Sequence, residues 1–214
     1  RMLEGQVALV TGAGRGLGRA FAERLAALGC NIAVHGMREH GPSEYGGTQT
    51  LTDVAHAIAT THGVRTVKVL GDLTRMDDIA RTASTASAEL GPIDILVHNA
   101  GGDIAAAGGK PDPNDVVHIK PEDVRAVIDR NLLSTIFVCQ QVATGMMQQR
   151  RGRIVTIGSV AAFKGRTNGS IYATAKAGAM HFTRCLADQM RAYDVTVNTI
   201  APGDTRTERF VATR

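Results

Sequence analysis

The sequence has few cysteines, no long hydrophobic run and no hydrophobic leader ahead of its first apolar segment. Its three cysteines, Cys30, Cys139 and Cys185, are odd in number, far apart and embedded in apolar sequence. We therefore expect reduced thiols in or near a core, and a cytoplasmic protein rather than a disulfide framework. No apolar stretch approaches the roughly 18 to 20 residues that a membrane-spanning helix needs, and no signal-peptide pattern is present. A membrane protein and a secreted protein are both disfavoured.

Clustered positive charge is also scarce, although the formal net charge is +4. The one dense basic run, Q-Q-R-R-G-R at 148–153, contains no interleaved aromatic residue and directly precedes an apolar strand. A solvated helix end is favoured over a nucleic-acid patch for this run. The seven histidines show no paired ligand spacing such as H-E-x-x-H. We expect no nucleic-acid partner and no metal site.

Glycine is abundant: there are 24 among 214 residues, against a usual share of roughly 7%. Many stand in short clusters at the ends of apolar runs, where they indicate tight turns and backbone that approaches a ligand. The length and the 43% hydrophobic content allow one sizeable core, so we expect a single domain over residues 1–214.

Apolar strand-like segments alternate with helical patterns along the whole chain. Such alternation predicts an α/β protein with a doubly wound Rossmann fold, a parallel sheet covered by helices on both faces. In this fold ligands bind beyond the carboxyl ends of the strands. We expect helices over 16–28, 48–62, 76–90 and 170–191, and a long helical region after Pro121. The expected strands are Val7–Val10, Asn31–His35, Arg65–Leu70, Ile93–Val97, Arg153–Ile157 and Val195–Ile200.

The first strand is followed by the glycine-rich loop T-G-A-G-R-G-L-G, residues 11–18. A Cβ at Gly12 or Gly16 would obstruct backbone approach to a pyrophosphate, and Gly18 lets the following helix pack close to the sheet. The free N–H groups and the positive end of that helix attract phosphates. The loop predicts nucleotide binding, with a purely structural turn as the alternative.

The stretch S-I-Y-A-T-A-K, residues 170–176, places Tyr172 four residues before Lys176. On a helix both side chains lie on one face. A phenol with a pKa of about 10 is a poor base at neutral pH, and a nearby cation would lower that pKa toward the working range. Ser159 stands at the end of a strand, thirteen residues before Tyr172. Its hydroxyl can there reach the carbonyl oxygen of a substrate on which Tyr172 acts. Alone, Y-x-x-x-K is more often a surface pair; its context favours catalysis.

Together, the glycine loop, the N-A-G at 99–101 and the set Asn131, Ser159, Tyr172 and Lys176 resemble the classical short-chain dehydrogenase/reductase family. The loop and layout resemble its 3-oxoacyl-carrier-protein reductase branch. The resemblance implies an oxidoreductase that transfers a hydride between a nicotinamide cofactor and a ketone or secondary alcohol. Tyr172 is then the general acid or base and Ser159 an oxyanion donor. Lys176 holds the nicotinamide ribose and lowers the tyrosine pKa, and Asn131 holds a water that links Lys176 to solvent.

The resemblance also implies a cofactor site, in which Asp72 contacts the adenine (or caps a helix) and Thr207 the carboxamide. Gly36 occupies the position where an acid would select NAD, and Arg15 and Arg38 could reach the extra phosphate of NADP. NADP(H) is favoured, and NAD(H) stays open. The expected cofactor-binding residues are Gly12, Arg15, Gly16, Leu17, Gly18, Arg38, Asp72, Leu73, Asn99, Ala100, Gly101, Tyr172, Lys176, Pro202, Gly203 and Thr207.

Three features depart from the family pattern. The chain ends at Arg214, soon after P-G, where the family continues with a helical lid and a last strand, so we expect a truncated chain. Asp204 and Thr205 follow P-G where apolar residues are usual. The loop Gly101–His118 makes the distance from Asn99 to Asn131 longer than usual, and we expect it at the rim of the site. The substrate, the direction of reaction and the expected homotetramer or dimer are not encoded in these motifs.

Two other functions stay open. A catalytically silent nucleotide-sensing protein could use the same fold, but the intact Ser159, Tyr172, Lys176 and Asn131 argue against it. The sugar-nucleotide epimerases and dehydratases of the extended family would need a T-G-x-x-G-x-x-G loop and a longer substrate domain. We expect a small carbonyl or alcohol substrate.

Overall fold

The computed structural model describes residues 1–212 and contains one six-stranded parallel sheet in the order β3-β2-β1-β4-β5-β6. This is the order of the classic dinucleotide-binding fold, and it confirms the predicted fold class. The strands are β1 (Val7–Thr11), β2 (Asn31–Gly36), β3 (Thr66–Leu70), β4 (Ile95–His98), β5 (Gly152–Ile157) and β6 (Val195–Ile200). The six predicted strands are all present, with ends displaced by at most two residues.

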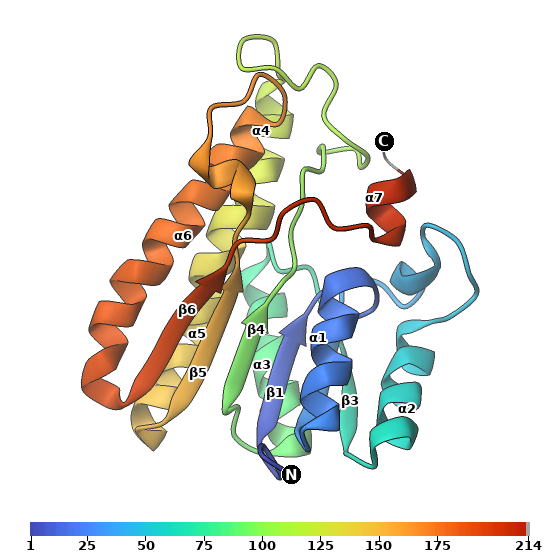
Figure 1. Ribbon diagram of the computed structural model, residues 1–214, viewed down its shortest axis with the longest axis vertical. Helices are drawn as coiled ribbons and strands as arrows, with labels where there is room; N and C mark the ends of the chain where they lie inside the picture. Colours follow the sequence, from blue (N-terminus) through green and yellow to red (C-terminus); the bar gives the residue numbers. More distant parts are fainter. Residues whose placement is uncertain (213–214) are drawn as a thin grey trace.

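Helices cover both faces of the sheet (Figure 1). The α-helices are α1 (Gly16–Ala27), α2 (Leu51–His62), α3 (Met76–Leu90), α4 (Pro121–Ile128), α5 (Ser134–Gln149), α6 (Ser170–Met190) and α7 (Glu208–Ala212). Short 3-10 turns are η1 (Gly41–Ser43), η3 (Val160–Phe163) and η4 (Arg191–Tyr193), and η2 (Asp129–Leu133) is a π-helical turn. The segment α7 had no sequence prediction.

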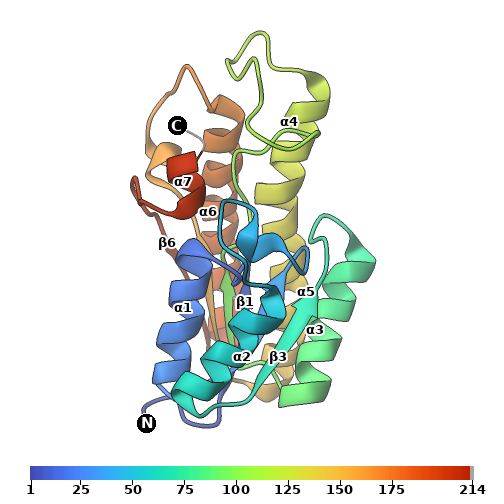
Figure 2. The ribbon, with the colours of Figure 1, turned by 90° about the vertical axis from the view of Figure 1, so that its right-hand side faces the viewer.

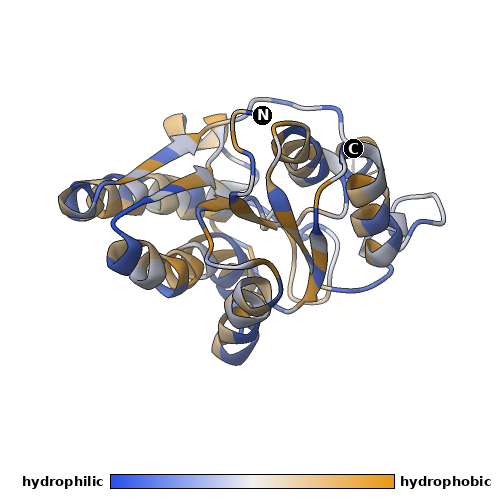
Figure 3. Cartoon of the chain, turned by 90° about the horizontal axis from the view of Figure 1, so that it is seen from below, coloured by the Kyte–Doolittle hydropathy of each residue, from blue (hydrophilic) through white to orange (hydrophobic). Residues whose placement is uncertain are grey.

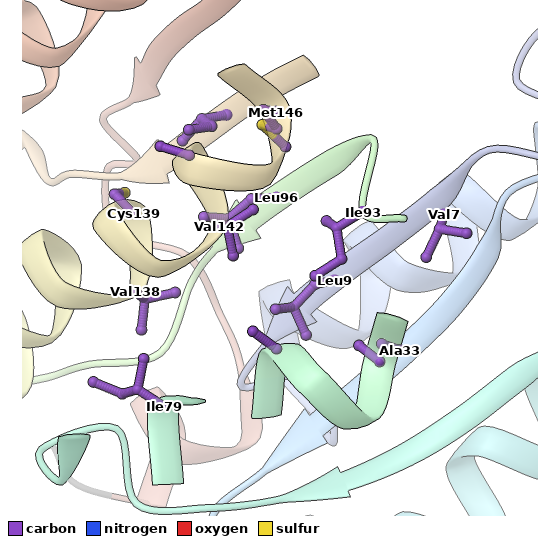
Figure 4. Close-up of a cluster of buried hydrophobic side chains, with 14 of the residues drawn as sticks. Val7, Leu9, Ala33, Ile79, Ile93, Leu96, Val138, Cys139, Val142 and Met146 are labelled. Atoms are coloured by element: carbon purple, nitrogen blue, oxygen red, sulfur yellow. The ribbon is translucent and has the colours of Figure 1, made fainter. Parts of the chain in front are cut away.

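Two hydrophobic clusters, one on each face, hold the layers together. One joins the strands to α3, α5 and α6, and it includes Leu9, Leu96, Val142 and Met146 (Figure 4). The other packs α1 and α2 on the opposite face. Coloured by hydropathy, the central strands are largely orange, and the helices carry both orange and blue residues (Figure 3). Burial of this apolar area is the main favourable contribution to folding.

Local sequence sets the helix boundaries. Thr50 and Asp53 form a reciprocal capping box, which satisfies two backbone donors and starts α2 at Leu51 rather than at the predicted Thr48. Gly63 ends this helix in the left-handed conformation, with φ +64°. The long helix expected after Pro121 is interrupted by the π-helical turn η2 at Asn131, a feature often found at functional sites.

Two sequence expectations about individual residues have different outcomes. Cys30 and Cys139 are buried, but Cys185 is exposed, so its expected place near the core is wrong. It lies on the outward side of α6, whose buried face carries Ala179, Thr183 and Leu186 at helical spacing. The basic run after α5 is a solvated helix end, as expected: Arg150 pairs with Asp194 at 3.1 Å and Arg151 with Asp94 at 2.9 Å.

No helix among residues 1–212 is long and apolar enough to cross a membrane. Within the same residues, no group of three or more His, Cys, Asp or Glu side chains is placed to hold a metal ion.

Candidate active site

The carboxyl ends of the strands open into a cavity of about 600 Å³. The loop 101–120 and α7 lie over this end of the sheet (Figure 2). Many of the predicted catalytic and cofactor-binding residues line this cavity. The lining includes Leu17, Asn99, Gly101, Ser159, Tyr172, Lys176, Pro202, Gly203 and Thr207.

The glycine loop fits a phosphate. Gly12 has φ +65°, and a Cβ on Gly18 would overlap the Gly12 carbonyl oxygen, so the absence of a side chain at Gly18 lets α1 pack closely against the loop. Arg15 is the N-cap of α1, and its side chain makes no capping hydrogen bond. The N–H groups of the first turn therefore keep their capacity to bind an anion.

Two buried histidines that the sequence did not single out support this loop. The Gly12 N–H donates to His35 Nδ1 at 3.2 Å, so Nε2 carries the proton and donates to the Gly71 carbonyl at 3.0 Å. Burial lowers the pKa of His35 to about 4. His98 Nδ1 lies 3.2 Å from the Thr11 hydroxyl, and burial lowers its pKa to about 3, with Lys176 adding to the effect. Both rings are therefore neutral at pH 7.

Asn99 ties β4 to β1. Its Nδ2 donates to the carbonyls of Thr11 and Gly12, at 3.2 and 3.3 Å. The backbone N–H groups of Asn99 and Ala100 both donate to Thr11 Oγ1. The N-A-G segment thus joins the ends of β1 and β4.

Ser159 and Tyr172 both line the cavity. Ser159 follows the end of β5, and Tyr172 lies in the first turn of α6. The Ser159 side chain lies near enough to the phenol to favour its charged form. Ser159 Oγ also accepts the Ala161 N–H at 3.1 Å. Burial raises the pKa of Tyr172, against the smaller lowering effects of Ser159, Arg209 and Arg166. The expected low phenol pKa is therefore wrong for this arrangement, since desolvation outweighs the nearby positive charges.

Lys176 is 5% exposed, and its Nζ donates to the Ile157 carbonyl at 2.7 Å. Nζ lies 5.8 Å from the centroid of the Tyr172 ring. Burial lowers the pKa of this ammonium from 10.5 to about 8. The lysine therefore remains mostly protonated at pH 7 but loses its proton far more readily than an exposed lysine.

Asn131 is fully buried in the π-helical turn. Its Oδ1 accepts the Gly102 N–H at 2.8 Å, and its Nδ2 donates to the carbonyls of Gly102 and Val127 at 2.9 and 2.8 Å. The side chain thus holds the loop that follows β4. Its predicted role in water binding stays a prediction.

Two arginines lie at the adenosine end of the predicted cofactor site. A smaller cavity of about 120 Å³ is lined by Gly36, Arg15 and Arg38. Arg15 is held by the loop after β2: its guanidinium donates to the Gly41 carbonyl at 2.5 Å, pairs with Glu44 at 2.9 Å and lies 4.5 Å from the centroid of the Tyr45 ring. Glu44 and Tyr45 were not among the residues predicted for this site.

Three predicted cofactor residues have other contacts. Asp72 Oδ1 accepts from the backbone and hydroxyl of Thr74, at 3.0 and 2.8 Å, in the turn before α3. Leu73 is buried in the core. Thr207 Oγ1 accepts the Phe210 N–H at 3.2 Å near the start of α7. Of the three, only Thr207 reaches the large cavity.

The loop 101–118 lies at the rim of the large cavity, as expected. Gly101, Gly102, Asp103, Lys110, Pro111 and Asn114 all contribute to its lining. Asp204 and Thr205, which follow P-G, also line it. Arg166 and Arg209 were not predicted; nothing in their local sequence distinguishes them from solvated arginines.

The known proteins to which the chain is similar are dehydrogenases and reductases. The family model described as short chain dehydrogenase matches residues 6–214. The chain is 37% identical over 216 residues to a cyclohexanol dehydrogenase of Rhodococcus sp. strain TK6, covering 97% of this chain and 77% of that protein. It is 36% identical over 205 residues to the 3-oxoacyl-acyl-carrier-protein reductase FabG of Escherichia coli strain K12, covering 96% and 75%.

Among solved structures, the chain is similar to a 7 alpha-hydroxysteroid dehydrogenase complexed with NADH and 7-oxo glycochenodeoxycholic acid. The TM-score is 0.82 at 30% identity, and the match covers 98% of this chain and 74% of the other.

Proposed function

The chain belongs to the short chain dehydrogenase family and is a nicotinamide-dependent hydride-transfer oxidoreductase, and from this premise we propose that it interconverts ketones and secondary alcohols with NADP(H). Tyr172 is the proton donor in reduction and the proton acceptor in oxidation. The observation that carries this proposal is that Ser159, Tyr172 and the buried Lys176 all lie on the wall of one cavity.

The residues around the cavity fit a dinucleotide. The uncapped first turn of α1 and the close packing at Gly18 suit the pyrophosphate. Lys176 is assigned the nicotinamide ribose in this proposal, and it lines the same cavity as Pro202, Gly203 and Thr207. When bound, the nicotinamide supplies or accepts the hydride.

The protein's own groups handle the proton and the developing charge. Ser159, anchored by the Ala161 N–H, donates its hydroxyl proton toward the substrate oxygen and stabilises negative charge there. Tyr172 transfers its proton to that oxygen in reduction. Because burial raises the pKa of Tyr172, the phenol is protonated at pH 7 and ready for reduction, whereas oxidation should accelerate as the pH rises.

The preference for NADP(H) rests on charge at the end of β2. Gly36 places no acid there, and Arg15 and Arg38 line the adjoining small cavity. A 2′-phosphate would find two guanidiniums and no repelling carboxylate at residue 36.

The test has two stages. Nicotinamide fluorescence during titration with NADPH and NADH gives the two affinities, and absorbance at 340 nm then follows reduction of cyclohexanone, β-keto esters and diketones. We expect tighter binding of NADPH and turnover of at least one ketone. Ser159→Ala should lower kcat about 100-fold, whereas Ser84→Ala, at an exposed position on α3, should not change it. Cofactor binding without turnover of any carbonyl compound or alcohol would overturn the proposal.

A further inference from the structure

Positive side chains outnumber negative ones on the wall of the large cavity. Among the described residues, its charged lining consists of Lys110, Arg166, Lys176 and Arg209 against Asp103 and Asp204. Lys176 already belongs to the proposed catalytic set. The Arg209 guanidinium donates to the carbonyls of residues 101 and 103, at 3.4 and 3.1 Å, and so ties α7 to the loop after β4. The proposed reaction gives no role to the two remaining cations, Lys110 and Arg166.

Arg166 lies close to the reacting group. It stands on the connection 164–169 between η3 and α6, six residues before Tyr172. Its charge lowers the pKa of the Tyr172 phenol, although burial has the larger and opposite effect. Other exposed arginines, such as Arg184 on α6, lie outside the cavity lining. Arg166 differs from them because it lies on the cavity wall, within electrostatic reach of a substrate bound at Tyr172.

Lys110 lies on the neighbouring loop 101–118. An antiparallel bridge between Asp115 and Asn168 fastens this loop to the connection 164–169. The two segments accordingly lie side by side near the start of α6 (Figure 1). Two joined loops therefore present the two cations to the same cavity.

The two acids of the lining do not pair with these cations. Asp103 Oδ2 accepts the Asn114 amide Nδ2–H at 2.7 Å, and Asp204 lies on the segment after β6. Within residues 1–212, the side chains of Lys110 and Arg166 make no ion pair or hydrogen bond. An anionic group that enters the cavity can therefore pair with either cation without breaking an existing ion pair.

Cations at the mouth of a cavity favour an anionic ligand group over a neutral or a positive one. A guanidinium binds a carboxylate through two parallel N–H···O bonds, and a lysine ammonium adds a point charge. The same wall repels an ammonium group. Because both side chains are exposed, each should contribute modestly to binding, and salt should weaken the effect.

We propose that Arg166, assisted by Lys110, binds an anionic group of the substrate, so that the enzyme prefers oxo acids and hydroxy acids to neutral ketones and alcohols of the same length. The proposal rests on the proposed function and names the substrate class of the same site. The substrate carbonyl lies at Tyr172 and the carboxylate at the mouth of the cavity. The length of the chain between them therefore decides whether both ends bind at once.

The test compares matched acids and esters. The oxo acids 4-oxopentanoate, 5-oxohexanoate and 6-oxoheptanoate are each reduced beside their neutral methyl esters, with saturating NADPH and absorbance at 340 nm. For the best chain length we expect kcat/KM to be about tenfold higher for the acid than for the ester. Raising the NaCl concentration from about 0.05 to 0.5 M should lower this ratio, because exposed charges are screened.

Variants of the two cations assign the preference to its residues. Arg166→Gln should reduce the acid-to-ester ratio about tenfold, and Arg166→Lys, which keeps the charge but not the planar fork, should reduce it by a smaller factor. Lys110→Gln should reduce it about threefold. Arg184→Gln is the matched control, since this exposed arginine lies outside the cavity lining, and it should leave the ratio unchanged. Far-UV circular dichroism checks that each variant is folded.

A wild-type ratio of one or less at every chain length, or a ratio that neither Arg166 variant changes, would overturn this inference while the oxidoreductase assignment stands. Nicotinamide fluorescence gives a second readout: an Arg166→Gln variant that binds NADPH more weakly and loses activity equally on acids and esters would also overturn it, because the guanidinium would then serve the cofactor. Failure of every carbonyl compound to react would instead overturn the proposed function, and this inference with it.

Discussion

The floor and the rim of the active site differ in how their polar groups are satisfied. The floor consists of buried polar side chains near the carboxyl ends of the strands, and each has a hydrogen-bond partner. Its members are Thr11, His35, His98, Asn131 and Lys176. The rim consists of the loops 37–50, 101–118 and 164–169, where Arg38, Lys110 and Arg166 are exposed and Asp103 and Asn114 keep unpaired oxygens. The floor is therefore fixed by its own hydrogen bonds, whereas the rim carries exposed charged side chains.

This contrast predicts that changes in the floor affect folding and all substrates, whereas changes in the rim affect the choice of cofactor or substrate.

The largest stability effect should come from acid. His35 and His98 stay neutral in the folded protein down to pH values of about 4 and 3, whereas in the unfolded chain both take up protons near 6.5. Between pH 6.5 and 4 the unfolded state binds more protons, so the free energy of unfolding should fall as the pH falls, by about 2–3 kcal/mol per pH unit. Urea unfolding at a series of pH values measures this slope.

His98→Gln should lower that slope by about half. His181→Gln, on the exposed side of α6, should leave it unchanged. An equal slope in wild type and His98→Gln would contradict the claim that the floor is held neutral.

Gly18→Ala should be the most damaging small substitution in the floor. The added Cβ would overlap the Gly12 carbonyl oxygen and lie 2.6 Å from Asn99 Nδ2, so the loop must move away from α1. We expect the variant to lose about 3 kcal/mol of stability and most of its cofactor affinity. Gly145→Ala, in α5 with open space around its Cβ position, should gain about 0.5–1 kcal/mol. Unfolding midpoints that coincide for wild type and Gly18→Ala would be evidence against close packing here.

Lys176→Met should lower the activity of the enzyme and raise its stability. Because burial lowers the pKa of Lys176 to about 8, holding its charge in the folded state is unfavourable. Removing it should raise the free energy of unfolding at pH 7 by about 2 kcal/mol, after about 1 kcal/mol is lost with the bond to Ile157. Between pH 8 and 10.5 the wild-type lysine loses its proton only when folded, so wild-type stability rises and the advantage of methionine shrinks.

Lys68→Met is the matched control, because this lysine lies on the surface and pairs with Glu39 at 2.8 Å. The free energy of unfolding of Lys68→Met should differ from that of the wild type by less than about 1 kcal/mol, both at pH 7 and between pH 8 and 10.5. A Lys176→Met variant that is less stable than wild type at pH 7 would show that the ammonium contributes favourably.

The smallest effect belongs to the rim. Glu44 pairs with Arg15 at 2.9 Å and would therefore compete for the guanidinium with the 2′-phosphate of the proposed NADP(H). Glu44→Gln should tighten NADPH binding by about three- to fivefold, since exposed ion pairs contribute about 1 kcal/mol or less, and should leave NADH binding unchanged. Glu23→Gln, which breaks a pair with Arg19 on α1, is the control. Weaker NADPH binding in Glu44→Gln would mean that Glu44 instead positions Arg15.

The same contrast explains what the sequence could predict. The doubly wound parallel sheet, the glycine loop and the Ser159–Tyr172–Lys176 set follow from local patterns, because alternating elements and a spacing of four residues on a helix leave few arrangements. The partners of Arg15, Asp103 and Asn114 depend on how irregular loops dock onto distant elements, and no periodicity encodes them. The raised pKa of Tyr172 was missed for a related reason: the motif shows a neighbouring cation, whereas burial depends on the complete fold.

The central proposal is that Tyr172 supplies the proton at the substrate oxygen, whereas cofactor binding depends on other residues, the first turn of α1 and Lys176 among them. Stopped-flow measurement of a single turnover of ketone reduction at 340 nm, for wild type and Tyr172→Phe, tests it most directly. The account predicts that the two proteins bind NADPH with similar affinity and that the rate of hydride transfer falls about 1000-fold in the variant. A Tyr172→Phe rate close to that of the wild type would contradict the claim.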